Sequence, residues 1–230
     1  MEPPQPPSNT HRVGTFEIPV INIGSIDIPD DKFGVSFIMI GATRSGKTTL
    51  LNYIYKKFFS EHLSILMSNS LQSDAYDFIQ KKVDAVSHHY HPQILKDMYH
   101  INHDTKNHYK FLAIVDDITD VRGDKEMTRL MTIYRNSRIS SIVCAQTATM
   151  MSPIARSNIN MVLLGRCNSS MQIERNLKDF LMGHFPTHMK LTEKIHLYKE
   201  LTKDHQWILL NQIDGTMYLT KLTTSQLIGT

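Results

Sequence analysis

Short apolar runs alternate along this chain with longer segments in which apolar residues recur at every third or fourth position. The runs are rich in β-branched residues and poor in charge, which is typical of strands buried on both faces of a parallel sheet. The amphipathic segments are typical of helices that cover such a sheet. The histidine-rich segment 88–110 has no clear pattern. The predicted strands are 35–40, 63–67, 109–115, 139–145 and 161–165, and the predicted helices are 47–59, 74–82, 125–135, 171–181 and 191–201.

The two ends of the chain depart from this alternation. Several prolines lie close to the N-terminus, so we expect residues 1–15 to form a disordered or extended arm. Residues 16–28 are predicted to form short strand pieces. Near the C-terminus, the pair Asp214-Gly215 separates two apolar runs. This pattern is typical of a β-hairpin.

Strands that alternate with helices predict an α/β fold, in which helices cover both faces of a mainly parallel sheet. We expect one domain over 16–230, with a core at about 34–166 and a C-terminal extension, 167–230, that ends in the hairpin. Hydrophobic residues make up 41% and charged residues 20%, as in ordinary soluble globular proteins. The formal net charge of +3 is at most a weak indication of an anionic partner.

Several classes of protein are disfavoured. A transmembrane helix needs an apolar run of about 18 residues, and none is present. The N-terminal residues also lack the apolar segment of a secretory signal. Cys144 and Cys167 lie in apolar runs and are expected to be buried free thiols. The spacing of His88, His89 and His91 fits no common zinc site, so no structural metal is expected.

Residues Gly41-Ala-Thr-Arg-Ser-Gly-Lys-Thr48 match the P-loop pattern G-x-x-x-x-G-K-[ST] in full. The match follows a predicted buried strand and begins a predicted helix. Glycines allow the loop to turn its N–H groups towards phosphates, and the helix N-terminus adds partial positive charge. Lys47 would contact the β- and γ-phosphates, and the Thr48 hydroxyl would bind Mg²⁺. The predicted Mg-ATP site comprises Gly41, Ala42, Thr43, Arg44, Ser45, Gly46, Lys47, Thr48 and Thr49.

Two acidic residues, Asp116 and Asp117, follow the predicted strand at 109–115. The carboxyl ends of parallel strands form the edge at which α/β sheets bind ligands. Asp116 is therefore predicted to hold Mg²⁺ as the Walker B acid, and Asp117 to polarise the attacking water. Glutamate is more usual at the second position, and the alternative role for Asp117 is to cap the following turn. The strand at 63–67 lies between the two motifs in the sequence, which favours a RecA-like ATPase of the additional-strand class.

The strand at 139–145 ends at the same predicted edge in an amide, Gln146. Gln146 could sense the γ-phosphate by a hydrogen bond to it or to the attacking water; the alternative is a strand-end amide bound to loop backbone. Arg135 and Arg156 flank this strand. An exposed arginine could reach the γ-phosphate held by a neighbouring subunit, although most single arginines are simply solvated.

Other P-loop classes fit less well. A GTPase would carry an N-K-x-D motif after a strand, and the sequence has none. A small-molecule kinase would need an acceptor pocket and an arginine-rich lid, and no clear candidate segment is present. A nucleotide-binding scaffold without hydrolysis is disfavoured, because Lys47, Thr48, Asp116 and Asp117 are all in place.

Taken together, these motifs resemble the poxvirus-type genome-packaging ATPases, which belong to the FtsK–HerA class and occur in large DNA viruses and virophages. The resemblance is best over about 36–165. It is carried by Gly41–Thr48, Asp116-Asp117, Tyr134-Arg135-Asn136, Cys144-Ala-Gln-Thr147 and Ile154-Ala-Arg-Ser-Asn-Ile159.

The resemblance implies an ATPase that uses Mg²⁺ and forms a homo-oligomeric ring, commonly a hexamer or pentamer. Such a ring moves double-stranded DNA into a preformed capsid and docks on a capsid or portal-vertex protein. Arg135, or as a second candidate Arg156, would act as an arginine finger towards the next subunit. The implied location is the virion or the virus assembly site in the host-cell cytoplasm, as a soluble protein. The alternatives are another FtsK–HerA-type DNA translocase or helicase, and a small-molecule P-loop kinase.

Overall fold

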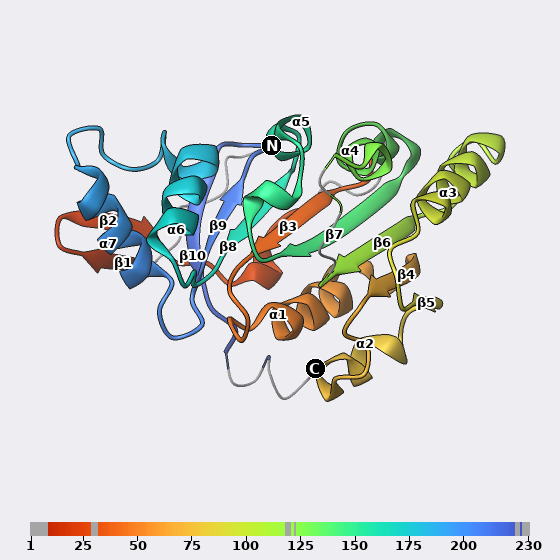
Figure 1. Cartoon of the computed structure of the whole chain (residues 1–230), viewed down its shortest axis with the longest axis horizontal. Coiled ribbons are helices and arrows are strands. Elements are labelled where there is room, and N and C mark those ends of the chain that lie inside the picture. Colours follow the sequence, from red (N-terminus) through yellow and green to blue (C-terminus); the bar gives the residue numbers. More distant parts are fainter. Residues whose placement is uncertain (1–8, 29–31, 118–120, 122, 224–225, 227–230) are drawn as a thin grey trace.

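The computed structural model describes residues 9–28, 32–117, 121, 123–223 and 226. Its central feature is an eight-stranded sheet with the order β10-β9-β8-β3-β7-β6-β4-β5 (Figure 1). The strands from β8 to β5 are parallel, whereas β9 and β10 form an antiparallel hairpin at one edge, as predicted. The strands are β3 (Ser36–Ile40), β4 (Leu63–Ser68), β5 (Ala85–Ser87), β6 (Phe111–Asp116), β7 (Ile139–Ala145), β8 (Met161–Leu164), β9 (Trp207–Asn211) and β10 (Thr216–Thr220).

The strand order places β7 between the strand that precedes the P-loop, β3, and the strand that ends in Asp116, β6. Ile40 at the end of β3 pairs with Ala145 of β7, and Asp116 pairs with Cys144. This is the order of an additional-strand P-loop NTPase, which confirms the predicted fold class. The sequence left the strand order open; the strand predicted at 63–67 is β4, which lies on the far side of β6.

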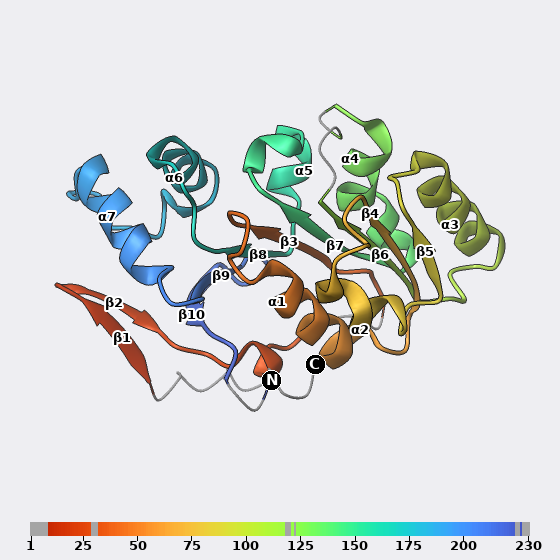
Figure 2. The same cartoon turned by 60° about the horizontal axis from the view of Figure 1, so that its bottom comes forward.

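Helices cover both faces of the sheet, because alternate residues of its central strands are buried on opposite sides. In β3, Ile38 and Ile40 pack into one core cluster, and Phe37 and Met39 pack into another. Figure 2 shows the two layers of helices: α1 and α2 cover the face that carries Phe37 and Met39, and α3 to α7 cover the face that carries Ile38 and Ile40. The helices are α1 (Lys47–Ile54), α2 (Asp77–Gln80), α3 (Pro92–Asp104), α4 (Lys125–Thr132), α5 (Pro153–Ser157), α6 (Ser170–Asn176) and α7 (Leu191–Leu201).

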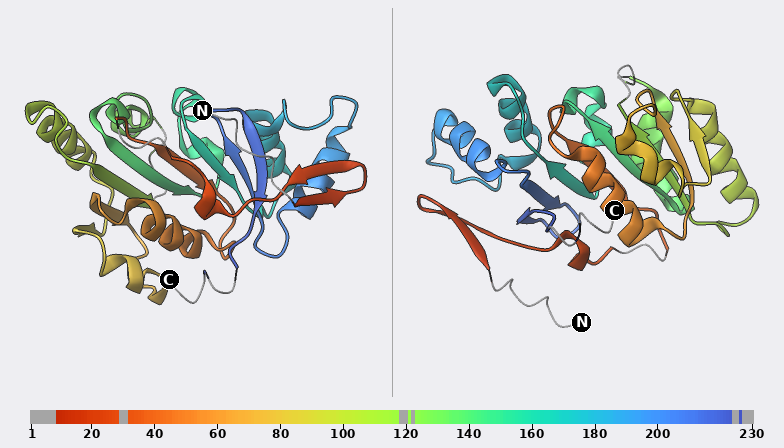
Figure 3. Two further views of the ribbon diagram at one scale, coloured as in Figure 1. Left: turned by 180° about the vertical axis from the view of Figure 1, so that it is seen from behind. Right: turned by 90° about the horizontal axis from the view of Figure 1, so that it is seen from below.

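The N-terminal region forms a separate hairpin of β1 (Thr10–Val13) and β2 (Phe16–Pro19). Figure 3 shows it, in red, at the end of the molecule that carries β9 and β10. Val20 continues from β2 and forms a parallel bridge with Leu219. The prediction of a disordered arm over 1–15 is therefore wrong for Thr10–Val13, because their backbone groups pair with β2; residues 1–8 lie outside the described residues.

Some predicted helices differ from the observed ones. Those at 47–59 and 171–181 begin as α1 and α6 and continue as π-helical turns, Tyr55–Phe59 and Leu177–Leu181. The segment 88–110 contains α3, which begins at Pro92, where proline is tolerated because first-turn N–H groups need no helical acceptor.

Cys144 and Cys167 are buried free thiols, as predicted. Within the part of the chain that the structure describes, no helix is long and apolar enough to cross a membrane.

Candidate functional site

The P-loop lies between the end of β3 and the start of α1. Gly46 has a φ of 93°, which side chains other than glycine rarely adopt. A Cβ atom at Gly41 would lie only 2.7 Å from the Ser45 hydroxyl oxygen, so a larger residue there would displace the Ser45 side chain. The Lys47 Nζ donates hydrogen bonds to the carbonyl oxygens of Gly41 (2.7 Å) and Ala42 (2.9 Å). The Lys47 side chain therefore lies over the P-loop, where we expect the phosphates to bind.

Asp116 is the last residue of β6 and is 2% exposed. The Tyr76 hydroxyl donates a hydrogen bond of 2.8 Å to its Oδ2 atom. Burial raises the pKa of the Asp116 carboxyl, because it disfavours the charged form, and the Tyr76 hydrogen bond and the charge of Lys47 oppose that shift. A buried carboxylate at the end of a strand, held in one orientation, suits a metal ligand.

Asp117 has a left-handed backbone, with a φ of 49°, directly after β6. The Ser70 hydroxyl donates a hydrogen bond to its carboxylate, and the Asn69 amide donates one of 3.2 Å to its backbone carbonyl oxygen. Both donors lie just after β4, the parallel neighbour of β6. The Asp117 side chain is thus held by a hydrogen bond from Ser70, at the end of the adjacent strand β4. Backbone strain of this kind is common at functional sites.

The predicted residues meet around one cavity of about 330 Å³ at the carboxyl edge of the sheet. Gln146, the first residue after β7, is exposed and lies there beside Lys47, Asp116 and Asp117. The predicted site residues Gly41, Ala42 and Ser45 are instead buried within the loop and do not line the cavity. The P-loop residues that line the cavity are Thr43, Arg44, Gly46, Lys47, Thr48 and Thr49.

The two candidate arginines differ in their surroundings. Arg156 is buried, donates hydrogen bonds to the carbonyl oxygens of Ala148 (3.1 Å) and Met151 (2.8 Å), and lies 3.3 Å from the carboxylate of Asp179. These contacts within its own chain argue against the finger role for Arg156. Arg135 is half-buried and donates one side-chain hydrogen bond, of 3.2 Å, to the Asn158 carbonyl oxygen.

Arg135 lies in a 3₁₀ turn, Tyr134–Ser137, at the start of β7, whereas the P-loop follows the end of the parallel strand β3. The backbone N–H of Gly34, before β3, donates to the Arg135 carbonyl oxygen at 2.7 Å. Arg135 is therefore at the opposite edge of the sheet from the P-loop of its own chain. Any contact between Arg135 and a bound phosphate would have to be made in a neighbouring subunit.

Sequence reasoning missed the residues that hold the two acids, Tyr76 and Ser70. The polar run Ser68-Asn-Ser70 at the end of a predicted strand could have indicated a second polar strand end beside Asp117. Tyr76 gave no such signal, because its position next to Asp116 depends on how the segment after β4 folds back over the sheet edge.

A family model described as the poxvirus A32 protein matches residues 30–218. This chain belongs to the poxvirus A32 protein family. The match confirms the resemblance to poxvirus-type genome-packaging ATPases that the sequence motifs indicated. It also supports the prediction that this protein is an ATPase. The match extends beyond the motif-bearing stretch 36–165 and includes much of the C-terminal extension.

Solved structures with a similar fold include B204, the genome packaging NTPase of Sulfolobus turreted icosahedral virus 2. Its complex with sulfate matches with a TM-score of 0.61 and 12% identity, over 84% of this chain and 98% of B204. Its complex with ATPγS matches with a TM-score of 0.57 and 14% identity, over the same shares of 84% and 98%.

The DNA-packaging ATPase B204 from Sulfolobus turreted icosahedral virus matches with a TM-score of 0.59 and 16% identity, over 85% of this chain and 98% of that one. At such identities the similarity shows a shared fold. No curated protein sequence gives a significant match to this chain.

Proposed function

We propose that this protein is a viral DNA-packaging ATPase. It works as a homo-oligomeric ring, a hexamer or pentamer, that hydrolyses ATP to ADP and phosphate and moves double-stranded DNA into a capsid. The observation that carries the proposal is the meeting of Lys47, Asp116, Asp117 and Gln146 around one cavity at the carboxyl edge of the sheet. Membership of the poxvirus A32 family supports it, as does the likeness in fold to the genome packaging NTPase B204.

The residues around this cavity fit Mg-ATP. The backbone N–H groups of the P-loop bind phosphate oxygens, and Lys47 exchanges its two loop carbonyl oxygens for the β- and γ-phosphates. Thr48 and Asp116 line the same cavity and supply the oxygen ligands that Mg²⁺ prefers. When bound, Mg²⁺ neutralises charge on the phosphates.

Hydrolysis needs a water molecule that is held and polarised next to the γ-phosphate. Asp117, fixed by Ser70, accepts the proton of that water, and Gln146 orients the water or the γ-phosphate by a hydrogen bond. Arg135 is the finger that a neighbouring subunit inserts, because it lies at the opposite edge of the sheet from its own P-loop. Each active site is then complete only in the ring.

The partners in this proposal are double-stranded DNA, further copies of the chain, and a capsid or portal-vertex protein. The protein acts in the virion or at the virus assembly site in the host-cell cytoplasm. Release of phosphate at one subunit interface shifts that interface, and the ring converts the shift into movement along DNA.

The test is ATP hydrolysis by the purified protein over a range of protein concentrations, with and without long double-stranded DNA. Turnover per subunit should rise steeply with protein concentration and further with DNA, since assembly completes the site. Turnover that is indifferent to both would contradict the ring motor and favour a monomeric, kinase-like NTPase.

The Arg135→Ala variant tests whether Arg135 acts on the active site of a neighbouring subunit or on that of its own subunit. The variant should lose about 10³-fold in turnover in the assembled ring, as expected for an arginine finger. Mixed with an excess of Lys47→Ala protein, which supplies intact arginines, Arg135→Ala subunits should regain turnover. Absence of rescue in mixed rings would contradict the finger role.

A further inference from the structure

The P-loop carries a second cation, Arg44, at a position where the motif accepts any residue. Arg44 is exposed and lines the same cavity of about 330 Å³ as Asp117 and Gln146. Among the described residues, none forms a hydrogen bond or an ion pair with the Arg44 side chain. Lys47, in contrast, donates to two carbonyl oxygens of the loop. The Arg44 guanidinium is therefore available to a ligand that enters this cavity.

The backbone at Arg44 would be easier to form with glycine. The Ser45 N–H donates a hydrogen bond of 3.2 Å to the Ala42 carbonyl oxygen, which closes a tight turn with Arg44 as its third residue. Arg44 has a φ of 62°, in the left-handed region. Glycine or asparagine is usual at the third position of a turn with this backbone. Strain at a residue other than glycine is common where the side chain has a function.

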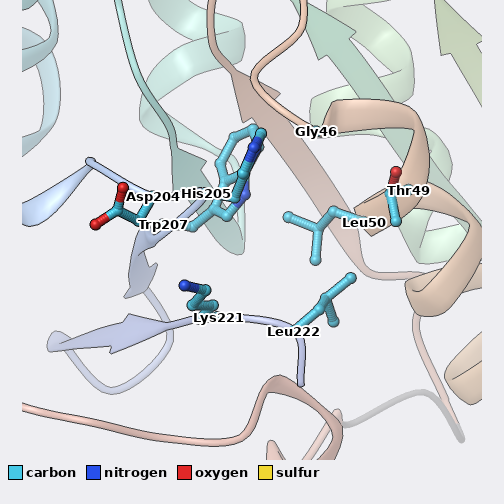
Figure 4. A pocket seen from close by; sticks show the side chains of 8 residues that line it. All are labelled: Gly46, Thr49, Leu50, Asp204, His205, Trp207, Lys221 and Leu222. Atoms are coloured by element: carbon cyan, nitrogen blue, oxygen red, sulfur yellow. The ribbon is translucent and has the colours of Figure 1, made fainter. Parts of the chain in front are cut away.

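Arg44 lies on the reaction side of the P-loop. A second cavity beside the loop, of about 540 Å³, is lined by Gly46 and Thr49 but not by Arg44 (Figure 4). The residues that we assign to the terminal phosphate, Asp117 and Gln146, line the same cavity as Arg44 and do not line the second one. The guanidinium thus shares its cavity with the end of the triphosphate at which the bond breaks.

The charges in this cavity leave a place for another cation. Its described residues include two carboxylates, Asp116 and Asp117, and Lys47 is the one cation besides Arg44. Negative charge develops on the phosphate oxygens during hydrolysis, and the two carboxylates oppose it. Lys47 offsets only one of them. An arginine presents five N–H donors in a rigid fork that matches phosphate oxygens, so Arg44 can supply the missing positive charge.

We propose that Arg44 is a catalytic residue of its own subunit, whose guanidinium binds the γ-phosphate oxygens and stabilises the charge that develops on them. The water oxygen bonds to the γ-phosphorus, the bond from that phosphorus to the β–γ bridging oxygen breaks, and ADP leaves with the electron pair. The proton of the water passes to Asp117. The γ-phosphate is then bound by Arg44 from its own subunit and by Arg135 from the next. This inference rests on the proposed function, since it needs ATP hydrolysis at this P-loop; it does not depend on DNA.

The test compares Arg44→Gly with a matched control, Lys106→Gly. Glycine removes the charge and suits the left-handed backbone at Arg44. Lys106 is also exposed and left-handed, with a φ of 53°, and it lies between α3 and β6, outside the P-loop. Turnover is measured by phosphate release at high protein concentration without DNA. Calorimetry measures binding of Mg-ATPγS and of Mg-ADP with aluminium fluoride, which mimics the phosphate during transfer.

Arg44→Gly should lose about 10²-fold in turnover and in affinity for the aluminium fluoride complex, as when one transition-state donor is removed. Its ATPγS affinity should stay within about threefold of wild type, and Lys106→Gly should keep all three values. An equal loss of ATPγS affinity would overturn the inference, because Arg44 would then act on the ground state alone. Turnover near that of wild type would overturn it as well. If wild type itself hydrolyses no ATP, the proposed function fails and the inference falls with it.

Mixed assemblies show whether Arg44 acts within its own subunit. Arg44→Gly protein is mixed with an excess of Lys47→Ala protein, whose arginines are intact. The missing guanidinium belongs to the subunit that binds the nucleotide, so turnover should stay at the low level of Arg44→Gly, whereas Arg135→Ala should regain turnover in the same mixture. Rescue of Arg44→Gly would show action between subunits and would overturn the inference.

Discussion

The cavity on the reaction side of the P-loop and a second cavity beside it are built from different parts of the chain. The reaction side lies at the carboxyl ends of parallel strands: Asp116, Asp117 and Gln146 end a strand or follow it directly, and Lys47 begins the helix after the P-loop. The second cavity, of about 540 Å³, is lined instead by Asp204 and His205 after α7, by Trp207 of β9, and by Lys221 and Leu222 after β10. Neighbouring parallel strands bring the first set together, whereas the second set reaches the P-loop only through the antiparallel edge of the sheet.

The difference shows how the two sides can change. Residues on the reaction side lie at the ends of buried strands, where the backbone is held in place. Replacing one of them therefore changes the chemistry of the site and leaves its geometry in place. Most residues of the second cavity come from a loop and a hairpin, which can vary without disturbing the central strands. We therefore expect substitutions on the reaction side to reduce turnover. Substitutions in the second cavity, which shares Gly46 and Thr49 with the reaction side, should mainly reduce affinity for the nucleotide.

Lys47→Ala should have the largest effect. It removes a side-chain charge that we assign to the phosphates within the same subunit, and turnover should fall by about 10³-fold, as when a transition-state donor is lost. Phosphate release measures it, with Lys57→Ala, an exposed lysine of the same segment, as the control. Near-normal turnover by the Lys47 variant would refute the position of the site.

Asp117→Asn should retain ATP binding and lose about 10²-fold in turnover, since the amide cannot accept the proton of the water. Binding is measured by calorimetry with ATPγS and turnover by phosphate release, and Asp77→Asn on α2 is the matched control. A variant that cannot bind nucleotide would show instead that Asp117 is a ligand or a structural residue.

Tyr76→Phe should act through Asp116, whose carboxylate loses its hydrogen bond. Partners that orient a metal ligand are worth about 10- to 100-fold in metal affinity, so the Mg²⁺ concentration for half-maximal turnover should rise about tenfold. A Mg²⁺ titration of turnover measures it, and Tyr109→Phe, on an exposed tyrosine, is the control. A loss of turnover that excess Mg²⁺ does not restore would contradict a positioning role for Tyr76.

His205→Asn should have the smallest effect, and it tests the point where the two sides meet. Asparagine tolerates the left-handed backbone at this position, so the change removes the ring and its contact with Ser45 without new strain. One such hydrogen bond is worth about 0.5–1 kcal/mol, so ATPγS affinity should fall roughly two- to fivefold. A change in turnover without a change in affinity would place His205 on the reaction side instead.

The same division explains how much the sequence could predict. Buried strands such as 139–145 and helices such as 191–201 were predicted at their observed bounds, because their patterns are local. The P-loop and Asp116 were predicted because a motif or a strand end marks each of them. Tyr76 and His205 belong to no motif, and their roles depend on contacts between residues far apart in the sequence.

What the sequence left open or misplaced has the same origin. Sequence order could not fix the strand order, and the structure places β7 between β3 and β6. Residues Thr10–Val13 were expected to be disordered because of the prolines before them, yet pairing with β2 orders them. Arg156 was a candidate finger until its contact with Asp179 placed it in the interior.

The central claim is that ATP hydrolysis at this P-loop moves double-stranded DNA. It is tested most directly by displacement of a third-strand oligonucleotide bound to a long DNA duplex. Wild-type protein with Mg-ATP should release the oligonucleotide, and Asp117→Asn protein should bind the nucleotide and release none. Brisk ATP hydrolysis by wild type at the same DNA, with the oligonucleotide left in place, would contradict the claim.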